Sequence, residues 1–389
     1  MRVLLSSESY WPNKDGGAIF EHWLVHRLLA AGHQVAVVAP GQRFMAARES
    51  DGASTIYRTP SVPLPLNTAY HITWLAMPTV RRALREFRPD VIHVNTMWLT
   101  GASLLKQARR WGIPKVATNH LMPENVLMSL PRLLRDASWL RDKFWRVLTR
   151  WHNKFDAVTS PTPTATKLLA DHGLIRPLYD ISNGVDTDYY HPGVANVAWL
   201  PPKVPYVLYF GRVNKEKRLD MLVRSFGLIA DQTPAHLVIA GAGNATEDLA
   251  KLITQLKLSS RVHMPGLVDD ETKLALAQGA QLFAITSPAE LQSIVCLEAM
   301  ACGQPIVAVN VAALVELCHD GENGYLVNLD DNQACANAIL SILSDQQTRQ
   351  RFGQFSRDFV VKYHSCAATE RKFTELYGCA IRRAFPASL

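Results

Sequence analysis

The first forty residues are MRVLLSSESYWPNKDGGAIFEHWLVHRLLAAGHQVAVVAP. Arg2–Ser6 and Gln34–Ala39 are short apolar runs, typical of buried parallel strands. Between them, apolar side chains recur at helical spacing at Ile19, Trp23, Leu24 and Leu28. The polar loop Glu8–Gly17 joins the first run to this helix. A strand, a loop, a helix and a strand in this order predict a βαβ unit of a parallel sheet.

The same alternation continues to residue 172 and starts again at Tyr206. In the first series the predicted helices are Arg81–Phe87, Gly101–Trp111 and Thr164–His172, and the strands are Val91–Val94, Lys115–Thr118 and Ala157–Ser160. In the second series the strands are Val207–Phe210, His236–Ala240, Val262–Met264, Leu282–Thr286 and Ile306–Val309, and the helices are Arg218–Ala230, Glu247–Leu256, Glu271–Ala277 and Ser293–Ala301. Two such series predict an α/β protein with two doubly wound, Rossmann-like parallel-sheet domains.

A run of prolines predicts the domain boundaries. Residues 187–205 contain Pro192, Pro201, Pro202 and Pro205. We expect them to link an N-terminal domain, residues 1–186, to a C-terminal domain, residues 206–365. Residues 366–389 are expected to form a helix that packs back on the N-terminal domain. The cleft between two such domains is the default position of a ligand site.

The composition is that of a folded protein with sizeable cores, since 48% of the 389 residues are hydrophobic and 19% are charged. The six cysteines lie in the C-terminal third, and none is spaced as Cys-x-x-Cys. We therefore expect reduced, buried thiols rather than a disulfide framework or a structural metal site. The N-terminal apolar run is too short for a signal peptide, and prolines interrupt the charge-free stretch Thr59–Val80. These features predict a cytoplasmic protein.

The net charge of +7 is unevenly distributed. Residues 1–186 contain 23 Lys and Arg against 14 Asp and Glu, a balance of +9, whereas the remaining residues have a balance of −2. A basic half suits nucleic acid, an anionic membrane or an acidic substrate. The chain has no recognised nucleic-acid-binding motif, so nucleic acid is not an expected partner.

The most informative stretch is PAELQSIVCLEAMACGQP, from Pro288 to Pro305. Glu290 follows a predicted strand, a helix begins near Ser293, and Glu298 lies eight residues after Glu290. The free N–H groups and the positive dipole end of such a helix suit a phosphate. Each glutamate taken singly also fits a solvated or capping carboxylate.

This stretch resembles the E-x7-E signature of retaining GT-B fold glycosyltransferases, specifically glycosyltransferase family 4 (group 1). Further matches occur in the family's order along nearly the whole chain, at Gly16-Gly17, His120, Asn183–Asp186, Gly211–Lys217, Ala240–Gly243 and Asp320–Leu326. The chain departs from the pattern at Leu291-Gln292-Ser293, where many members have Gly-Phe-Gly. That difference bears on the donor sugar more than on the activity. The resemblance implies two Rossmann-like domains that face each other across a cleft.

The resemblance also implies roles for single residues of the donor site. Arg212 and Lys217 are expected to clamp the diphosphate of a nucleotide sugar, and the same two residues also fit a solvated basic loop. Glu290 is expected to contact the donor sugar and Glu298 the ribose. The remaining expected donor contacts are the backbone at Ser293, Ile294 and Val295, which cradles the phosphates, and Gly241, Gly243 and Leu267 near the base.

Two N-terminal residues complete the expected site. The resemblance implies that Gly17 lies against the donor phosphates and the acceptor, and that His120 lines the sugar site near the anomeric carbon. Gly17 also fits an ordinary tight turn, and His120 an ordinary structural histidine. The expected reaction retains the configuration by front-face attack, with Glu290, His120, Arg212 and Lys217 as the catalytic set. No cofactor and no essential metal are expected, because the cationic side chains and the helix dipole replace the metal.

The segment Arg132–Lys154 bears on the acceptor. It holds seven basic and two acidic residues, interleaved with Leu, Trp and Phe at helical spacing. Such a helix suits an anionic membrane surface and equally suits a helix packed on its own sheet with its charges in solvent. We expect a lipid or lipid-linked glycan acceptor at the inner membrane face, with soluble sugars or a growing polysaccharide as alternatives.

The sequence leaves other functions and donors open. A UDP-sugar is the first expected donor and GDP-mannose the second, from their frequency in the family. A GT-B sugar-nucleotide epimerase would share the architecture but needs neither an acceptor nor this E-x7-E arrangement. A non-catalytic nucleotide-sugar-binding protein would bind the donor without turning it over.

Overall fold

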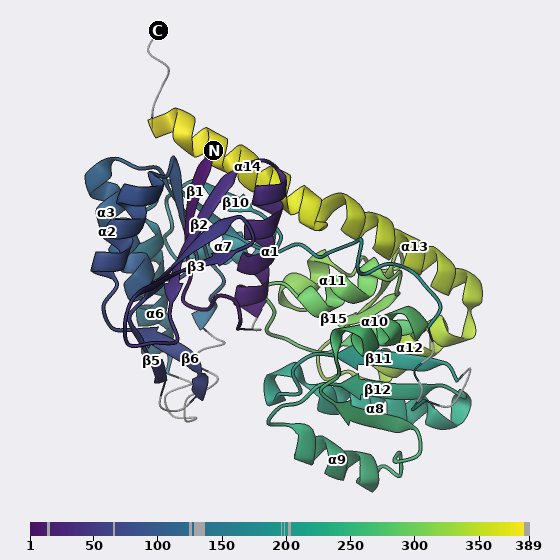
Figure 1. Cartoon of the computed structure of the whole chain (residues 1–389). Helices are drawn as coiled ribbons and strands as arrows, with labels where there is room; N and C mark the ends of the chain where they lie inside the picture. Colours follow the sequence, from purple (N-terminus) through teal and green to yellow (C-terminus); the bar gives the residue numbers. More distant parts are fainter. Residues whose placement is uncertain are drawn as a thin grey trace. The chain divides into compact units, whose positions relative to one another are not determined.

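The strand–helix–strand unit at the start of the chain forms as β1 (Arg2–Ser6), α1 (Gly16–Ala30) and β2 (Gln34–Pro40) in the computed structural model (Figure 1). The structure describes residues 1–13, 16–64, 67–123, 127, 137–195, 197, 199–200 and 204–384. Gly16 and Gly17 are the first two residues of α1, so the helix starts two residues earlier than expected. The chain divides into unit 1, Met1–Asn183 with Cys366–Leu389, and unit 2, Gly184–Ser365.

Unit 1 contains an eight-stranded sheet in the order β10-β9-β8-β7-β1-β2-β4-β3. The pairs are parallel except β3 with β4 at one edge. The strands after β2 are β3 (Ala47–Asp51), β4 (Ser54–Thr59), β7 (Val91–Val94), β8 (Lys115–Thr118), β9 (Ala157–Ser160) and β10 (Leu178–Asp180), with a separate hairpin of β5 (Ser61–Leu64) and β6 (Asn67–Thr73). Among the described residues, the helices of unit 1 are α1, α2 (Met77–Phe87), α3 (Leu99–Trp111), α6 (Ser138–His152), α7 (Pro163–Asp171) and α14 (Cys366–Ala384).

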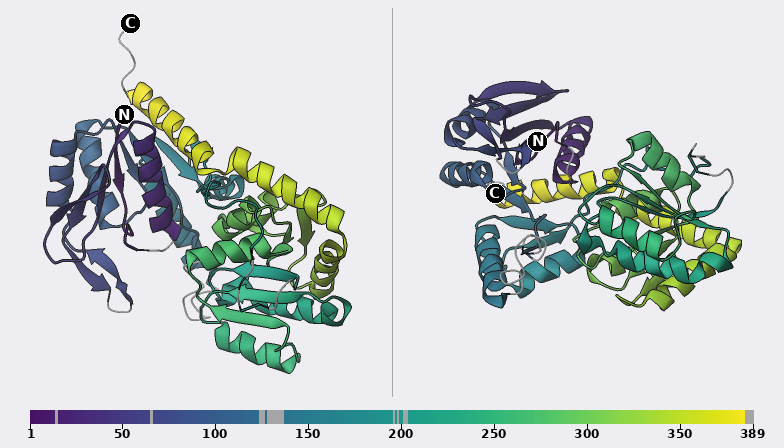
Figure 2. Two further views of the ribbon diagram at one scale, coloured as in Figure 1. Left: turned by 45° about the vertical axis from the view of Figure 1, so that its right-hand side comes forward. Right: turned by 90° about the horizontal axis from the view of Figure 1, so that it is seen from below.

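Helix α14 belongs to unit 1 although it is the last helix of the chain, and it lies beside the unit 1 sheet in both views of Figure 2. Its buried side chains Phe373, Leu376, Tyr377 and Ala380 share one core with α1 and with Val3 and Leu5 of β1. A buried polar chain fixes the helix: His93 Nδ1 lies 2.7 Å from the Tyr377 hydroxyl, and His93 Nε2 lies 2.6 Å from Thr118 Oγ1. Unit 1 is therefore discontinuous in the sequence, because α14 follows the whole of unit 2.

Replacing Tyr377 with phenylalanine is expected to lower the free energy of unfolding of unit 1 by about 1–3 kcal/mol, because His93 Nδ1 loses its partner in a dry interior. Hydrogen–deuterium exchange of the β7 and β8 amides measures this loss for unit 1 alone. The control is Tyr363→Phe, at a side chain on unit 2 that is 44% exposed. A Tyr377→Phe protein that exchanges no faster than Tyr363→Phe contradicts the anchoring role.

Unit 2 contains a six-stranded parallel sheet in the order β13-β12-β11-β14-β15-β16. Its strands are β11 (Tyr206–Phe210), β12 (His236–Ala240), β13 (Val262–Gly266), β14 (Leu282–Ile285), β15 (Ile306–Val309) and β16 (Gly324–Val327). Its helices are α8 (Leu219–Ile229), α9 (Thr246–Gln255), α10 (Asp270–Gly279), α11 (Ile294–Ala301), α12 (Asn332–Ser344) and α13 (Gln346–Tyr363), with short 3-10 turns at Lys215–Lys217, Ala230–Gln232 and Ala312–Glu316. Apolar runs such as Tyr206–Phe210 are fully buried, as expected for strands covered on both faces.

The proline-rich segment 187–205 is part of unit 2 rather than a separate linker, and the unit boundary lies between Asn183 and Gly184. Tyr190 and Leu200 are buried in the unit 2 core, which explains the difference. The Arg357 guanidinium also donates hydrogen bonds to the carbonyls of Thr187 and Tyr190 at 3.0 and 2.7 Å. Prolines indicate irregular backbone, but they carry no information about which side chains of that backbone are buried.

The basic segment Arg132–Lys154 is described only from residue 137, and residues 132–136 lie outside the described part of the chain. Helix α6 buries Trp145, Leu148, Thr149 and His152 and leaves its basic side chains exposed, while Trp139 is 60% exposed. Within the described residues, no helix is long and apolar enough to cross a membrane.

Candidate active site

The sheet of unit 2 has its topological switch point between β11 and β14. From β11 the chain proceeds to β12 and β13 on one side, and from β14 to β15 and β16 on the other. In open parallel sheets, ligands bind at the carboxyl ends of the strands at this point. The loop after β11 begins with Gly211, whose φ of 137° suits glycine, and the loop after β14 contains Glu290.

These two loops meet in one buried ion pair. Lys217 Nζ lies 2.5 Å from Glu290 Oε1, and the two side chains are only 10% and 11% exposed. The Thr286 hydroxyl donates to the carbonyls of Lys217 and Arg218 at 3.0 and 2.9 Å, so the end of β14 fixes the backbone that carries the lysine. Two residues that are 73 positions apart in the sequence thus form a rigid charged pair at the switch point.

Helix α11 starts beside the same loop. The Ser293 hydroxyl caps the helix by accepting a hydrogen bond from the Cys296 N–H at 3.3 Å. A Cβ placed on Gly211 would lie 3.6 Å from Val295 Cγ1, so the first turn of α11 lies against the Gly211 loop. Ile294 and Val295 are partly exposed. The positive end of a helix dipole therefore lies next to the loop that carries Lys217, and this arrangement suits a phosphate.

Glu298 is held by partners that the sequence did not indicate. Its Oε1 lies 3.1 Å from Lys273 Nζ, and Tyr190 also hydrogen-bonds the carboxylate. Lys273 Nζ lies over the Tyr190 ring, 5.2 Å from its centroid. Burial raises the pKa of Glu298, and the ammonium group of Lys273 opposes that shift. Lys273 is on α10 and Tyr190 is in the segment taken as a linker, so only the folded chain brings the three together.

Of the other predicted donor residues, Arg212 and Leu267 are exposed, whereas Gly241 and Gly243 are closely packed. Arg212 is 71% exposed, and its NH1 lies 3.9 Å from Glu216 Oε1, which leaves the guanidinium largely in solvent. A Cβ on Gly241 would lie 1.8 Å from the Gly211 carbonyl oxygen, and one on Gly243 would lie 2.3 Å from the Val213 carbonyl oxygen. Close packing of the loops after β11 and β12 therefore explains both glycines. Leu267, just after β13, is 82% exposed.

In unit 1, one of the two predicted residues, Gly17, is in α1, and the other, His120, contacts a side chain of that helix. Gly17 is the second residue of this helix, and Phe20, one turn later, contacts the His120 ring edge-on with 4.9 Å between centroids. Burial lowers the pKa of His120 to about 4, so its imidazole is neutral near pH 7. His120 Nε2 is inaccessible to solvent and has no hydrogen-bond partner among the described residues.

Sequence reasoning missed Glu8, which lies at the switch point of the unit 1 sheet, where β1 neighbours β7. Its Oε1 accepts a hydrogen bond of 2.8 Å from the Thr100 N–H, in the first turn of α3. Burial raises the pKa of Glu8 from 4.5 to about 7, although hydrogen bonds from Thr100 oppose the shift. The sequence feature that could have identified Glu8 is a carboxylate two residues after the first strand, in Ser-Ser-Glu-Ser.

Several exposed aromatic and sulfur-containing side chains follow the strands that neighbour β1 in the unit 1 sheet. Phe44 follows β2 and stacks on Trp74 with 4.8 Å between centroids, and Trp98, between β7 and α3, is 70% exposed. Met45 is 76% exposed. Because the carboxyl ends of parallel strands lie at one edge of a sheet, Trp98 and the segment after β2 are at the edge that holds Glu8.

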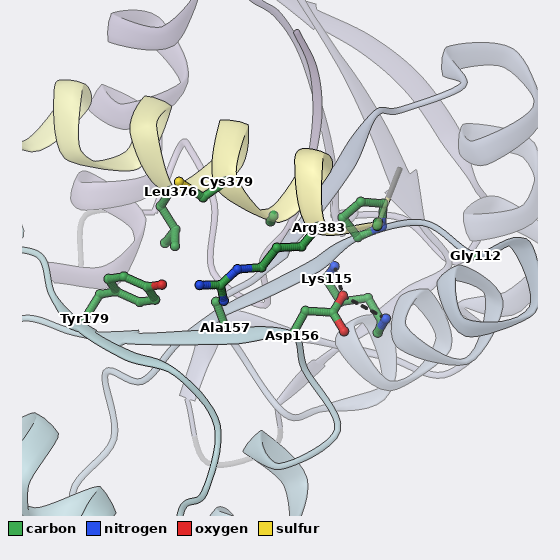
Figure 3. A pocket seen from close by; sticks show the side chains of 11 residues that line it. Gly112, Lys115, Asp156, Ala157, Tyr179, Leu376, Cys379 and Arg383 are labelled. Carbon is green, nitrogen blue, oxygen red and sulfur yellow. Dashed lines mark hydrogen bonds and ion pairs between the residues drawn. The ribbon is translucent and has the colours of Figure 1, made fainter. Parts of the chain in front are cut away.

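Figure 3 shows a pocket of about 220 Å³ between α14 and the opposite edge of the unit 1 sheet. The Arg383 side chain extends into it from α14, between Tyr179 and Asp156. Asp156 Oδ2 accepts a hydrogen bond of 2.9 Å from Lys115 Nζ. Lys115 begins β8 and Ala157 begins β9, so the pocket lies at the amino ends of these strands, away from the edge where ligands bind in such sheets.

Comparison with known proteins agrees with this geometry. The model of glycosyl transferases group 1 matches residues 197–359, and the model of Glycosyltransferase Family 4 matches residues 15–189. Together the two models cover most of both units.

Two relatives that are named as transferases align with most of this chain. The chain is 28% identical over 333 residues to the sulfoquinovosyl transferase SQD2 of Arabidopsis thaliana, an alignment that covers 82% of this chain and 63% of the plant protein. It is also 28% identical over 373 residues to a GDP-mannose-dependent alpha-mannosyltransferase of Mycobacterium tuberculosis, covering 93% of this chain and 92% of that protein.

A solved structure supports the fold. The sucrose-phosphate synthase of Thermosynechococcus elongatus superposes with a TM-score of 0.79 at 22% identity and covers 100% of both chains. The predicted architecture of two Rossmann-like sheets is thereby confirmed as the GT-B fold. The chain belongs to the group 1 glycosyltransferases of family 4 and is a glycosyltransferase.

Proposed function

We propose that this enzyme moves a hexose from a nucleoside diphosphate sugar to an acceptor hydroxyl with retention of configuration. A UDP-hexose is the first choice of donor and GDP-mannose the second. The Lys217–Glu290 pair at the switch point of unit 2, beside the start of α11, is the observation that carries the proposal. A buried cation and a helix N-terminus are the groups that a leaving diphosphate requires, because negative charge develops there as the glycosidic bond breaks.

Each donor residue has a role that fits its surroundings. Lys217 neutralises the diphosphate from a fixed position, and the exposed Arg212 side chain closes on it from solvent. The backbone at Ser293–Val295 holds phosphate oxygens. Glu290 orients Lys217 and contacts the sugar, while Glu298 holds the ribose. Gly241, Gly243 and Leu267 border the base.

The proposed chemistry needs neither a covalent nucleophile nor a metal ion at the diphosphate. The acceptor attacks the anomeric carbon from the face that the leaving group departs, and the departing phosphate oxygen takes the acceptor proton. The two cations and the helix dipole stabilise the diphosphate. Gly17 approaches the phosphates and the acceptor, and the neutral His120 lines the sugar site.

The acceptor is proposed to be a lipid or a lipid-linked glycan at the cytoplasmic face of a membrane. Two features of unit 1 support this. The first is the exposed pair of Phe44 and Trp74 with Met45 and Trp98. The second is the basic exposed face of α6, on which Trp139 is 60% exposed. Apolar side chains beside basic ones suit a lipid whose headgroup is anionic.

Nucleotide release from a panel of UDP-, GDP- and ADP-sugars, with and without bacterial lipid extract, tests donor and acceptor together. We expect release from one donor class, stimulated by lipid and lost in Glu290→Gln. Release that is stimulated by a soluble glycan and not by lipid would contradict the lipid acceptor and leave the transfer reaction intact. Tight nucleotide binding by a folded protein without release from any donor would point to a non-catalytic binder.

A further inference from the structure

A cluster of two histidines and an aspartate lies in unit 1, outside the proposed donor site. His22 and His26 are on α1, four residues apart and therefore on one face of the helix. Asp51 ends β3, in the hairpin that joins β3 to β4. The ligand atoms of these three side chains all lie within 4.8 Å of one another, which is close enough to hold a metal ion. No other group of three or more His, Cys, Asp or Glu side chains among the described residues meets this condition.

The three ligand atoms form a nearly equilateral triangle. His22 Nε2 and His26 Nε2 each lie 3.2 Å from Asp51 Oδ2, and the two Nε2 atoms lie 3.2 Å from each other. Ligand atoms bound at about 2.0–2.1 Å with tetrahedral angles are about 3.3–3.4 Å apart. The side chains are therefore already spaced for three corners of a tetrahedral site.

Hydrogen bonds alone cannot pair all three of these ligand atoms with a suitable donor or acceptor. A neutral imidazole carries one proton: if both Nε2 atoms carry it, the two N–H groups face each other without an acceptor between them, and if one does not, its lone pair faces Asp51 Oδ2. The Tyr10 hydroxyl donates to the same Oδ2 at 3.1 Å, so that oxygen already has a donor. A cation at the centre accepts lone pairs from both histidines and the carboxylate at once.

The surroundings hold the ligands in place. The Trp11 ring stacks on His22 with 5.0 Å between centroids and 23° between planes. The Arg58 guanidinium donates to the Trp11 carbonyl at 2.7 Å and fixes that loop. Tyr10, through its hydrogen bond to Asp51, occupies the position from which an outer partner orients a metal-binding carboxylate.

We propose that His22, His26 and Asp51 bind a zinc ion that fastens α1 to the β3–β4 hairpin. Two imidazoles and one carboxylate in tetrahedral spacing suit zinc, whereas magnesium and calcium prefer sites built from oxygen ligands. Water takes the fourth position, since the His26 side chain is 40% exposed. Helix α1 carries Gly16 and Gly17 at its start, so the ion also steadies the helix whose first turn belongs to the proposed site. The ion takes no part in the transfer chemistry.

The test measures metal binding and not activity. After treatment with a chelator, the full-length protein is titrated with Zn²⁺ against a chromophoric competitor, and bound metal is counted by mass spectrometry. We expect one zinc per chain, with an affinity that falls at least about 100-fold in His22→Asn and in Asp51→Asn. The matched control is His236→Gln in unit 2, where His236 stacks on His263 and their Nδ1 and Nε2 atoms lie 2.7 Å apart. It should leave zinc affinity within about twofold of the wild type.

Co²⁺ substitution decides the matter if a variant fails to fold, because it uses the wild-type protein. Intense visible absorption bands of tetrahedral Co²⁺, displaced by one equivalent of Zn²⁺, support the site. Three outcomes overturn it: zinc uptake by the wild type that is no tighter than by His22→Asn, equal loss of zinc in His236→Gln, or a cobalt spectrum of the free aquo ion.

Discussion

Lys217→Ala is expected to lower kcat by about 10²- to 10³-fold, the range seen when one fixed group that stabilises developing negative charge is removed. Lys217 is a cation held at 2.5 Å from Glu290 with a side chain that is 10% exposed, so water replaces it poorly. Glu290→Gln is expected to cause a loss of similar order, because the lysine loses its orienting charge and the sugar loses a contact. Steady-state nucleotide release with the preferred donor measures both.

The neighbouring Lys215 provides the control. It lies on the same short turn, but its side chain is 69% exposed and pairs with Asp248 at 3.0 Å. Lys215→Ala is expected to keep kcat within about twofold, since exposed ion pairs contribute little. Equal losses in Lys215→Ala and Lys217→Ala would contradict the specific role of the buried cation.

A loss of activity in a Lys217 or Glu290 variant could come from misfolding instead of lost catalysis, and the two causes have to be separated. Removing one partner of a buried ion pair costs about 3–5 kcal/mol of stability, because the other charge stays buried without compensation. The double variant Lys217→Met, Glu290→Gln removes both charges and is expected to regain most of that stability while remaining inactive. Recovery of activity in the stabilised double variant would show that the single variants were merely unfolded.

Glu8→Gln is expected to remove a pH dependence from the stability of unit 1. The folded protein keeps the Glu8 proton up to about pH 7, whereas the carboxyl group ordinarily releases it near 4.5. The stabilisation linked to Glu8 is therefore complete below pH 4.5 and is lost as the pH rises through 7. For a shift of this size the total is about 3 kcal/mol at pH 8 and above.

Urea unfolding of wild type and variant between pH 6.5 and 8.5 tests this. Over that interval the buried His93, His120 and His152, whose pKa values are lowered to about 3 or 4, stabilise both proteins equally as the pH rises, because only the unfolded chain still binds protons at these side chains. The wild type should therefore lose stability relative to Glu8→Gln, by about 1 kcal/mol between pH 6.5 and 8.5. Glu86→Gln alters an exposed carboxylate whose pKa is lowered by Arg82, and it should leave the wild-type slope unchanged. Parallel slopes for wild type and Glu8→Gln would show that Glu8 is already ionised at pH 6.5.

The sequence predicted both halves of the charged pair but not the pair. Lys217 follows one apolar run and Glu290 another, and the pattern of strands and helices shows that each lies at a carboxyl end. Only the sheet order, which places β11 beside β14, brings the two into contact. Tyr190 and Lys273 were missed for a related reason, because their contact with Glu298 depends on how irregular backbone packs.

The unit 1 sites show a second limit of sequence patterns. Glu8 was taken as part of a polar loop, because its partner Thr100 is 92 positions away. The spacing of His22 and His26 was visible in the sequence, but the third member, Asp51, ends the strand Ala47–Asp51, whose three central residues are exposed and which has no apolar alternation. Edge strands paired on one side can be polar throughout, so periodicity does not find them.

The discontinuity of unit 1 inverts the usual order of folding during synthesis. Domains commonly fold in the order in which the ribosome releases them, the N-terminal one first. Here the core of unit 1 lacks Phe373, Leu376 and Tyr377 until α14 has been synthesised, whereas unit 2 ends at Ser365. The unit encoded second is therefore the first to be complete. Throughout translation of residues 184–365, the nascent first unit therefore exposes the apolar side chains that α14 later covers.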